Sequence, residues 1–334
     1  MNKFIRILAA GLAAAAPLAV FASPLADLTE VEAAIERGAI VWDVRPADEY
    51  RRGHLPGAVN IGDPTKVLRE PGREDFVPTY RIEAILGAAG IDPAQEVVVY
   101  GRRGAHAAYF GRFALRYFGG NRVAVYHDGI DGWRQAGRRL DAGGARRTPT
   151  ALRLHPRPEL IVTTDEIVAA TKAGADLQLV DVRTRAEHSG EDVRAIRGGH
   201  IPGSINIPYE LNWRDHEAAR KLARGEVPDN GGMALNDRAA LEDLYSALDP
   251  FKETIVYCQS GTRSAVTATI LEALGFPRVK IYDASWLGYA ARLDAPVDNE
   301  SFVNVGALQA RLRALAGRLD RFEREARAPV AERR

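Results

Sequence analysis

The only cysteine of the chain, Cys258, lies where an apolar segment meets a short polar loop in the stretch IVYCQSGTRSA, residues 255–265. The apolar residues before it predict a strand, and the apolar spacing in SAVTATILEAL predicts a helix directly after the loop. Loop N–H groups and the positive end of a helix dipole stabilise an anion, which lowers the pKa of a thiol placed there. Gly261 permits a tight loop, and Arg263 adds a fixed positive charge. These features favour a thiolate nucleophile that attacks or holds an anionic group over an inert core cysteine.

The residue counts exclude several kinds of site. One cysteine can form neither an internal disulfide nor a redox pair, and it cannot supply a cysteine cluster for zinc. The seven histidines show no His-x-x-x-His spacing, so we predict no metal and no cofactor. The 45 basic and 44 acidic side chains leave a net charge of +1, which argues against nucleic acid as a partner.

The elements that would position Cys258 occur twice in the chain. Residues 40–61 and 179–207 each contain an apolar strand ending in Asp-Val-Arg, then Gly-His-hydrophobe-Pro-Gly and a second short strand. Further along, EVVVYGRRGAHAAYFGRFALRYFGG corresponds to ETIVYCQSGTRSAVTATILEALGF, and NRVAVYHDGIDGWRQAG corresponds to PRVKIYDASWLGYAAR. Short buried strands that alternate with helices predict an α/β fold with two tandem domains, each a mostly parallel sheet with helices on both faces.

Each repeat is preceded by a helix whose start can be predicted. TEVEAAIERGA opens on Thr29 with Glu32 three residues later, and TTDEIVAATKAGA opens on Thr163 with Glu166. This spacing is typical of a capping box, in which the two side chains satisfy free backbone N–H groups of the first turn.

The N-terminus has the composition of a secretory signal. Lys3 and Arg6 precede an apolar run at residues 7–21, which is too short for a comfortable membrane span, and a small residue, Ala22, follows. We therefore predict a signal peptide over residues 1–22 and a periplasmic or secreted protein that has no contact with the membrane after cleavage. The alternative is an uncleaved anchor.

The repeats set the expected domain boundaries. The first domain covers residues 23–143 and the second covers residues 159–297, with a Pro-containing linker at 144–158. Within the second domain, residues 209–250 have no counterpart of equal length in the first, and their Gly, Pro and Asn content predicts a loop that borders the pocket. The remainder, residues 298–334, is a predicted amphipathic helix and tail.

That tail carries apolar residues at alternating spacings of three and four, an a/d heptad seam among Arg and Glu residues. Two interpretations stay open: the helix packs back on the domain, or it forms a coiled coil by self-association or with a protein partner. The residues of the seam are Val305, Leu308, Leu312, Leu315, Leu319, Phe322 and Ala326.

The doubled Asp-Val-Arg and Gly-His-x-Pro-Gly motifs, the loop Cys-x-x-Gly-x-Arg-Ser and the following YDASW resemble the tandem-domain rhodanese family of thiosulfate and 3-mercaptopyruvate sulfurtransferases. The resemblance covers nearly all of the chain after the signal, except the tail. It implies that Cys258 takes sulfur from a small donor as a persulfide and passes it to cyanide or a thiol. It also implies that the loop after Cys258 binds the substrate. The loop residues are Gln259, Ser260, Gly261, Thr262, Arg263 and Ser264.

The sequence departs from the family pattern at three places. Gly101 aligns with Cys258, so we expect the first domain to be a non-catalytic scaffold and a wall of the interdomain cleft. Glu187 stands where thiosulfate-type members carry a donor-binding arginine. The loop matches neither the thiosulfate nor the mercaptopyruvate type, which leaves the donor unassigned. The possible substitutes for the missing donor contact are Arg185, Arg194 and Arg197.

Several other motif residues are expected to hold the fold, because they occur in both the thiol-bearing and the thiol-free repeat. We expect the two Asp-x-Arg pairs to stabilise the strand ends and the two histidines to fix the Gly-His-x-Pro-Gly turns. Trp286 is expected to pack near the site. The paired residues are Asp43 with Arg45, Asp181 with Arg183, and His54 with His200.

Two other functions are considered. A cysteine phosphatase also uses a thiolate in an amide-lined loop, but it has five residues between cysteine and arginine, whereas four separate Cys258 from Arg263. A persulfide carrier or binding module that works with a protein partner would explain both Glu187 and the heptad seam. The sequence therefore predicts a rhodanese-type sulfurtransferase, with the carrier as its alternative.

Overall fold

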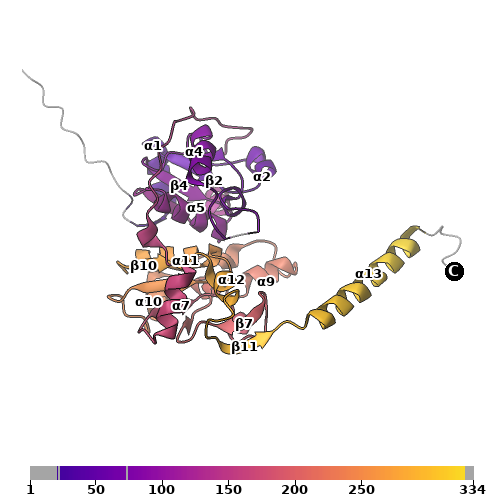
Figure 1. Cartoon of the computed structure of the whole chain (residues 1–334). Coiled ribbons are helices and arrows are strands. Elements are labelled where there is room, and N and C mark those ends of the chain that lie inside the picture. Colours follow the sequence, from indigo (N-terminus) through magenta and orange to yellow (C-terminus); the bar gives the residue numbers. More distant parts are fainter. Residues whose placement is uncertain (1–20, 22, 73, 328–334) are drawn as a thin grey trace, which may run out of the picture.

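The computed structural model describes residue 21, residues 23–72 and residues 74–327. The predicted signal peptide, residues 1–22, thus lies outside the described residues except for Phe21. Figure 1 shows two α/β bodies side by side, one from each half of the chain, and a long helix that leaves the second body.

The N-terminal domain is built on five parallel strands in the order β1–β5–β4–β2–β3. The strands are β1 (Leu25–Ala26), β2 (Ile40–Asp43), β3 (Val59–Asn60), β4 (Val97–Tyr100) and β5 (Val123–Tyr126). The helices are α1 (Leu28–Glu36), α2 (Ala47–Arg52), α3 (Pro64–Val67), α4 (Thr79–Ala88), α5 (His106–Tyr117) and α6 (Gly129–Gln135).

Alternation along each strand places apolar side chains on both faces of this sheet. In β4, Val97 and Val99 face the core that α4 and α5 cover, whereas Val98 and Tyr100 face the core that α1 and α6 cover. All four residues are fully buried. The near-continuous apolar strand is therefore explained by a sheet with helices on both sides, as the sequence predicts.

The C-terminal domain repeats this plan with four parallel strands in the order β10–β9–β6–β8 and a separate antiparallel pair, β11 and β7. The strands are β6 (Gln178–Asp181), β7 (Arg197–His200), β8 (Ile205–Asn206), β9 (Thr254–Tyr257), β10 (Val279–Ile281) and β11 (Asp298–Phe302). The helices are α7 (Thr164–Lys172), α8 (Arg185–His188), α9 (Ala218–Ala223), α10 (Arg238–Leu244), α11 (Thr262–Ala273), α12 (Ser285–Ala290) and α13 (Val305–Arg327). The 3₁₀ turns are η1 (Pro158–Leu160), η2 (Tyr209–Asn212) and η3 (Gly231–Met233).

One of the two predicted capping boxes is confirmed. Thr163 caps α7, with its hydroxyl accepting from the backbone N–H of Glu166 while the Glu166 carboxylate accepts from that of Thr163. The box predicted at Thr29 is wrong, because the N-cap of α1 lies two residues earlier. Asp27 is its N-cap and forms the reciprocal pair with Glu30 at 2.8 and 3.0 Å. Aspartate and threonine are both favoured N-cap residues, so residue type alone did not distinguish Asp27 from Thr29 as the N-cap of α1.

The loop predicted over residues 209–250 is wrong in part, because the segment contains two short helices, α9 and α10, and two 3₁₀ turns. Helices of six and seven residues leave too short a pattern for periodicity to predict. The segment reaches the N-terminal domain: the Met233 carbonyl lies 2.8 Å from Nε2 of His127, and Asn230 donates to the carbonyl of Arg103 at 3.1 Å.

The duplicated Asp-x-Arg pairs hold corresponding turns, as predicted. Arg45 donates from Nη2 to Asp43 at 2.5 Å and to the Gly53 carbonyl at 2.8 Å. Arg183 makes the matching bonds to Asp181 at 2.6 Å and to the Gly199 carbonyl at 2.8 Å. Both guanidinium groups are buried, so they stabilise the turns after β2 and β6 rather than bind a ligand. The turn histidines also bond to backbone carbonyls, His54 to Tyr50 and His200 to His188.

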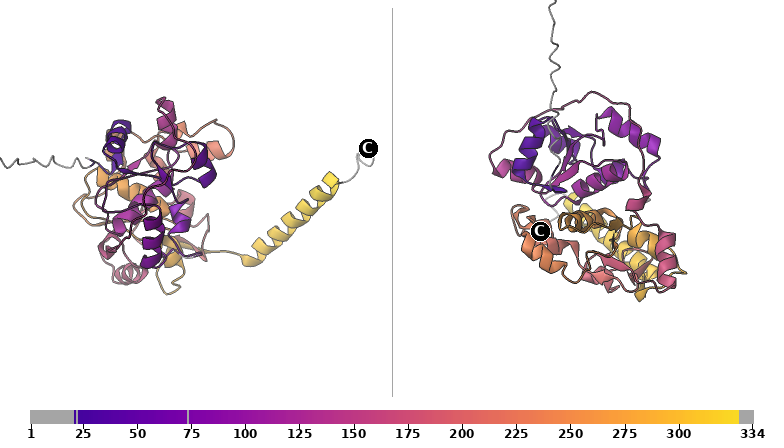
Figure 2. Two further views of the ribbon diagram at one scale, coloured as in Figure 1. Left: turned by 90° about the horizontal axis from the view of Figure 1, so that it is seen from above. Right: turned by 90° about the vertical axis from the view of Figure 1, so that its left-hand side faces the viewer.

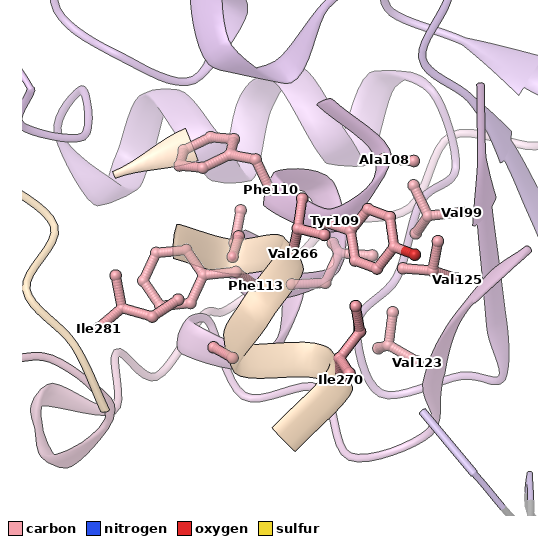
Figure 3. Close-up of a cluster of buried hydrophobic side chains, with 14 of the residues drawn as sticks. Val99, Ala108, Tyr109, Phe110, Phe113, Val123, Val125, Val266, Ile270 and Ile281 are labelled. Carbon is pink, nitrogen blue, oxygen red and sulfur yellow. The ribbon is translucent and has the colours of Figure 1, made fainter. Parts of the chain in front are cut away.

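The two domains share one apolar core, formed where α5 packs against α11, its counterpart in the second repeat. Figure 3 shows Phe110 and Phe113 of α5 beside Val266 and Ile270 of α11. Since a shared core of this kind resists separation, we expect the domains to move as one body. The loop that begins α11 is thereby placed at the domain boundary.

Helix α13 projects away from both domains (Figures 1 and 2). Its apolar side chains remain in solvent, with Leu312 57% and Leu319 59% exposed. Packing of this helix on the C-terminal domain, one of the two alternatives above, is therefore wrong. Within the described residues, no helix combines the length and apolar character that crossing a membrane requires.

Candidate active site

Cys258 is the first residue after β9, at the carboxyl end of the parallel sheet, where ligands bind in this type of fold. The loop Cys258–Gly261 leads directly into α11. Gly261 is the N-cap of that helix and has a left-handed backbone with φ of 79°, which a residue with a side chain would adopt only at a cost. Cys258 is 1% exposed and belongs to the buried apolar cluster that also contains residues of α5 and α11.

Each of the four carbonyl groups of this loop, those of residues 258–261, accepts a hydrogen bond from a donor outside the loop. Because each carbonyl is turned outward and fixed, the N–H groups between them are turned toward the opposite side. Among the described residues, no hydrogen bond from the N–H of Gln259, Ser260, Thr262 or Arg263 is observed. The bonds to the carbonyls are Trp286 N to Cys258 O (3.0 Å), Leu287 N to Gln259 O (3.1 Å), Arg69 Nη1 to Ser260 O (2.5 Å) and Ser264 Oγ to Gly261 O (2.7 Å).

These open N–H groups and the start of α11 together give the loop a positive polarisation. Such a loop stabilises a small anion without any change of its own structure, because its donors are already oriented. The loop can therefore lower the energy of a thiolate on Cys258 and of a negative sulfur bonded to it. This is the role that the sequence predicts for residues 259–263.

Ser285, the first residue of α12, has its Oγ 4.0 Å from the sulfur of Cys258. Its Oγ accepts hydrogen bonds from the N–H of Cys258 at 3.1 Å and of Gly261 at 3.0 Å. The hydroxyl proton has two acceptors within reach: the Tyr282 carbonyl at 2.8 Å and the Cys258 Sγ at 4.0 Å. Ser285 thus fixes both ends of the loop and offers a donor to the sulfur.

The backbone of Ser285 is strained, with φ of 50°. In the first repeat the corresponding residue of YHDG is Gly129, which has nearly the same φ of 53°. The thiol-free domain thus meets this left-handed conformation with glycine, whereas the thiol-bearing domain retains a serine there. Strain that is kept where glycine would relieve it indicates that the hydroxyl is required.

Arg263 forms a bidentate ion pair with Glu187, with both N–O distances at 2.7 Å. Burial alone would lower the pKa of Arg263, but hydrogen bonding to Glu187 and the nearby Cys258 sulfur raise it above its ordinary value. Burial would raise the pKa of Glu187, whereas hydrogen bonds from Arg263 hold it below its ordinary value. Both groups are therefore charged in the folded protein.

The comparisons with known proteins agree with this architecture. The family model of the rhodanese-like domain matches residues 27–136 and, separately, residues 163–292. The chain belongs to the rhodanese-like family. This rhodanese-like chain is 33% identical to a thiosulfate sulfurtransferase of Corynebacterium glutamicum, over 75% of its own length and 81% of the relative's. It is 31% identical to one of Azotobacter vinelandii, over 78% and 90% of the two lengths. The protein is accordingly a sulfurtransferase with two rhodanese-like domains.

Solved structures show the same fold. An anaerobic ergothioneine biosynthesis enzyme from Chlorobium limicola superposes with a TM-score of 0.69 and 22% identity, covering 82% of this chain and 70% of that one. A 3-mercaptopyruvate sulfotransferase of Escherichia coli, SseA, gives a TM-score of 0.65 and 24% identity, covering 79% and 99%. At these identities the similarity carries the tandem rhodanese fold alone.

The structure separates the three arginines predicted as substitute donor contacts. The Arg194 side chain is 52% exposed, and its guanidinium lies 3.2 Å from the carboxylate of Glu187 at the rim of the rhodanese loop. The Arg194 carbonyl also accepts from Gln259 at 2.8 Å, which joins its segment to the loop. Arg185 is exposed at the start of α8. Arg197 is buried and donates to carbonyls of residues 290, 292 and 295 and to Glu300. Only Arg194 is thus brought next to the loop.

Arg69 of the N-terminal domain was not predicted as part of the site. It is 5% exposed, donates to the Ser260 carbonyl and forms ion pairs with Asp283 and Glu74. Burial raises the pKa of Asp283 to about 6 even with Arg69 against it. The first rhodanese domain therefore contributes a residue that holds the loop of the second. No sequence signal marks it, because Arg69 lies 191 residues from Ser260.

The corresponding loop of the first domain cannot serve as a second site. A side chain at Gly104 would meet Met233 and Trp213, which shows that the 209–250 segment covers this loop. Arg102 and Arg103 are paired with Glu49 and Asp128. The 209–250 segment was predicted to border the Cys258 pocket, and its first residue does: the Tyr209 ring lies 5.9 Å from the Arg263 guanidinium.

Replacement of Glu187 by glutamine is expected to destabilise the fold by about 3 kcal/mol at neutral pH, because Arg263 would keep a buried charge without its counter-ion. The folded-state pKa of Glu187 is lowered, so its contribution is present above the pKa of the unfolded chain and is lost as pH falls through the folded value. Urea unfolding should therefore separate the variant from wild type at pH 7, and the difference should be smaller at about pH 3, below the ordinary glutamate pKa. An equal difference at both pH values would contradict the ion pair.

Proposed function

We propose that this sulfurtransferase moves a sulfane sulfur from thiosulfate or a related donor to cyanide or a thiol through a persulfide on Cys258. The observation that carries the proposal is the loop after β9, in which every carbonyl is held by a donor outside the loop and the N–H groups of Gln259, Ser260, Thr262 and Arg263 bond to no described residue. A ring of oriented N–H groups suits a negatively charged sulfur one atom beyond Sγ. No general base is needed, because a thiolate is itself the nucleophile.

In the proposed reaction, the Cys258 thiolate attacks the outer sulfur of thiosulfate and forms an S–S bond. The bond between the two donor sulfurs breaks, and sulfite leaves with its electron pair. An acceptor such as cyanide then attacks the outer sulfur of the persulfide, and the electrons of the S–S bond return to Cys258. Each step is a two-electron displacement, so no external oxidant or reductant enters the cycle.

Arg194 is the proposed contact for the anionic donor. Glu187 neutralises Arg263, so the additional positive charge at the loop comes from Arg194 at the rim. The names of the curated relatives support thiosulfate as the donor. We also propose that the protein acts outside the cytoplasm, in the periplasm or after secretion, on the basis of its N-terminal sequence.

A second candidate function is that of a persulfide carrier for a protein acceptor. It is favoured by Glu187, which stands where the family resemblance predicts a donor-binding arginine and is saturated by bonds to Arg263, Arg194 and Thr184. A carrier would load at Cys258 in the same way but would not turn over with small acceptors.

Mass spectrometry of the intact protein after incubation with each donor tests the proposal. Thiosulfate is expected to add the mass of one sulfur atom, and cyanide is expected to remove it with release of thiocyanate. Absence of the adduct with both thiosulfate and 3-mercaptopyruvate would overturn the persulfide. If the adduct forms but cyanide and small thiols leave it in place, the carrier becomes the better description.

Two substitutions at Ser285 distinguish the effect of its hydroxyl group from the effect of its strained backbone. Ser285→Ala leaves the N–H groups of Cys258 and Gly261 without their acceptor and keeps the strained backbone. Ser285→Gly also removes the hydroxyl but relieves the strain, as Gly129 does in the first domain. Both variants should load sulfur about tenfold more slowly. Both lose the acceptor of these N–H groups, so Ser285→Ala should lose about 1–3 kcal/mol of stability and Ser285→Gly less, because the relieved strain offsets part of the loss. Loading rates from stopped-flow and unfolding in urea measure the two effects, and normal loading by Ser285→Gly would exclude a role for the hydroxyl.

A further inference from the structure

Helix α13 carries an apolar seam that the remainder of the described chain leaves uncovered. Its six large apolar side chains are exposed by fractions that run from 49% for Leu308 to 61% for Phe322. The 23-residue helix points away from both domains, so no other segment of the described chain shields the seam (Figures 1 and 2). An isolated helix of this length is only marginally stable in water, and an amphipathic one gains most of its stability from a partner.

We propose that α13 pairs with α13 of a second copy of this chain in a parallel, two-stranded coiled coil. The seam occupies heptad positions a and d alone. Between residues 305 and 323, the flanking e and g positions hold Gln309, Arg311, Ala316, Arg318 and Glu323 rather than large apolar residues. A helix that packs on a globular body or lies in a membrane surface has a wider apolar face that includes e or g. The narrow seam fits the contact between two helices.

Charge complementarity selects the parallel orientation. In a parallel pair, a residue at g faces the residue at e of the next heptad in the other copy, which places Arg318 opposite Glu323 twice across the dimer. Arg311 faces the uncharged Ala316 of the second copy in the same arrangement. In antiparallel pairs g faces g, so Arg318 would lie opposite Arg311 or opposite its own copy. Parallel pairing thus gains two attractive contacts and has no repulsive one at these positions.

The proposed dimer leaves sulfur transfer untouched. The helix begins after β11, and its seam residues have no contact with the loop of Cys258. In the proposed dimer, the domains of both chains therefore lie at the same end of a short coiled coil, and each chain keeps its own Cys258 loop. The proposed dimer does not depend on the identity of the sulfur donor.

Sedimentation equilibrium of the mature full-length chain tests the proposal. Wild type is expected to show a reversible monomer–dimer equilibrium, and Leu312→Asp is expected to be monomeric with unchanged sulfur transfer per chain. Gly317→Ala, a change outside the seam, is the control and should keep the dimer. A wild-type chain that stays monomeric at every concentration would overturn the proposal, and so would binding to anionic phosphatidylglycerol vesicles by the monomer alone.

Charge reversal and cross-linking test the orientation. Arg318→Glu should raise the dissociation constant about tenfold or more at low salt, and the double variant Arg318→Glu with Glu323→Arg should restore it. In the Cys258→Ser background, Leu315→Cys should form an intermolecular disulfide on mild oxidation, because equal d positions meet only in a parallel pair. Tighter association of Arg318→Glu, or no disulfide from a dimeric Leu315→Cys variant, would overturn the parallel arrangement.

Discussion

Replacement of Cys258 by serine is expected to abolish sulfur loading and to reduce turnover to the uncatalysed rate. A hydroxyl cannot form a persulfide, and the chain has no other thiol to replace it. The loop should survive, because its carbonyls are held by Trp286, Leu287, Arg69 and Ser264 rather than by the sulfur. Loss of activity with a normal circular dichroism spectrum and a change in unfolding free energy below about 2 kcal/mol is the expected result.

A transplanted thiol provides the control for this result. Gly101→Cys places a cysteine at the matching position of the first domain, and we expect it not to restore activity in the Cys258→Ser background. That loop has His106 where the second has Arg263, and Met233 lies against it. Loading at position 101, detected by mass spectrometry of the peptide, would mean that a thiol on this strand–loop–helix unit is sufficient and that the surrounding residues matter little.

The parts of the fold that could be predicted from the sequence are the elements that occur in both repeats. Each repeat places apolar residues so densely in its strands that only a sheet covered on both faces explains them, and β4 and β9 both have this form. Local chemistry also marked the loop, since strand, polar turn and helix follow one another within residues 254–273. The heptad seam of α13 was visible for the same reason, because its spacing is local.

The residues that escaped prediction act over long separations in the chain. Ser285 lies 27 residues from Cys258, and nothing in the spacing of its motif YDASW marks the serine as part of the site. Arg69 lies in the first domain, 191 residues before Ser260, whose carbonyl it binds. Only the packing of α5 against α11 brings it to the loop of Cys258. Spacing arguments find neighbours within one element, whereas these contacts depend on how two sheets are placed.

Glu187 illustrates a departure that the structure explains. In the sequence, Glu187 stands where the family resemblance predicts a donor-binding arginine. In the structure its carboxylate accepts from both Nη atoms of Arg263 at 2.7 Å and from Thr184 at the start of α8. Its carboxylate therefore neutralises the charge of the partly buried Arg263, and the donor contact passes in our proposal to Arg194.

Replacement of Arg69 by methionine is expected to slow sulfur loading about 10- to 100-fold and to destabilise the fold by about 3 kcal/mol. Methionine fills similar volume against Phe110, whose ring lies 4.4 Å from the guanidinium, but it cannot donate. The Ser260 carbonyl would then be free to turn inward, where it would oppose an anion. Asp283 and Glu74 would lose their buried counter-ion at the same time.

The pH dependence of this variant follows from Asp283. Its pKa is already raised to about 6 by burial, and loss of the Arg69 charge would raise it further. A carboxyl with a raised folded-state pKa costs stability once it ionises, so the penalty grows as pH rises from the unfolded value near 4 through the folded value. The difference in stability between Arg69→Met and wild type should therefore narrow in urea unfolding below about pH 6.

A double variant separates the two consequences of losing Arg69. Asp283→Asn removes the uncompensated buried charge, so Arg69→Met with Asp283→Asn should regain most of the lost stability. It should not regain the loading rate, because the Ser260 carbonyl still lacks its donor, whereas Arg69→Lys should recover part of the rate. Recovery of both stability and rate in the double variant would mean that Arg69 merely holds the domains together. Recovery of stability alone identifies Arg69 as the residue through which the thiol-free domain positions the loop of the thiol-bearing one.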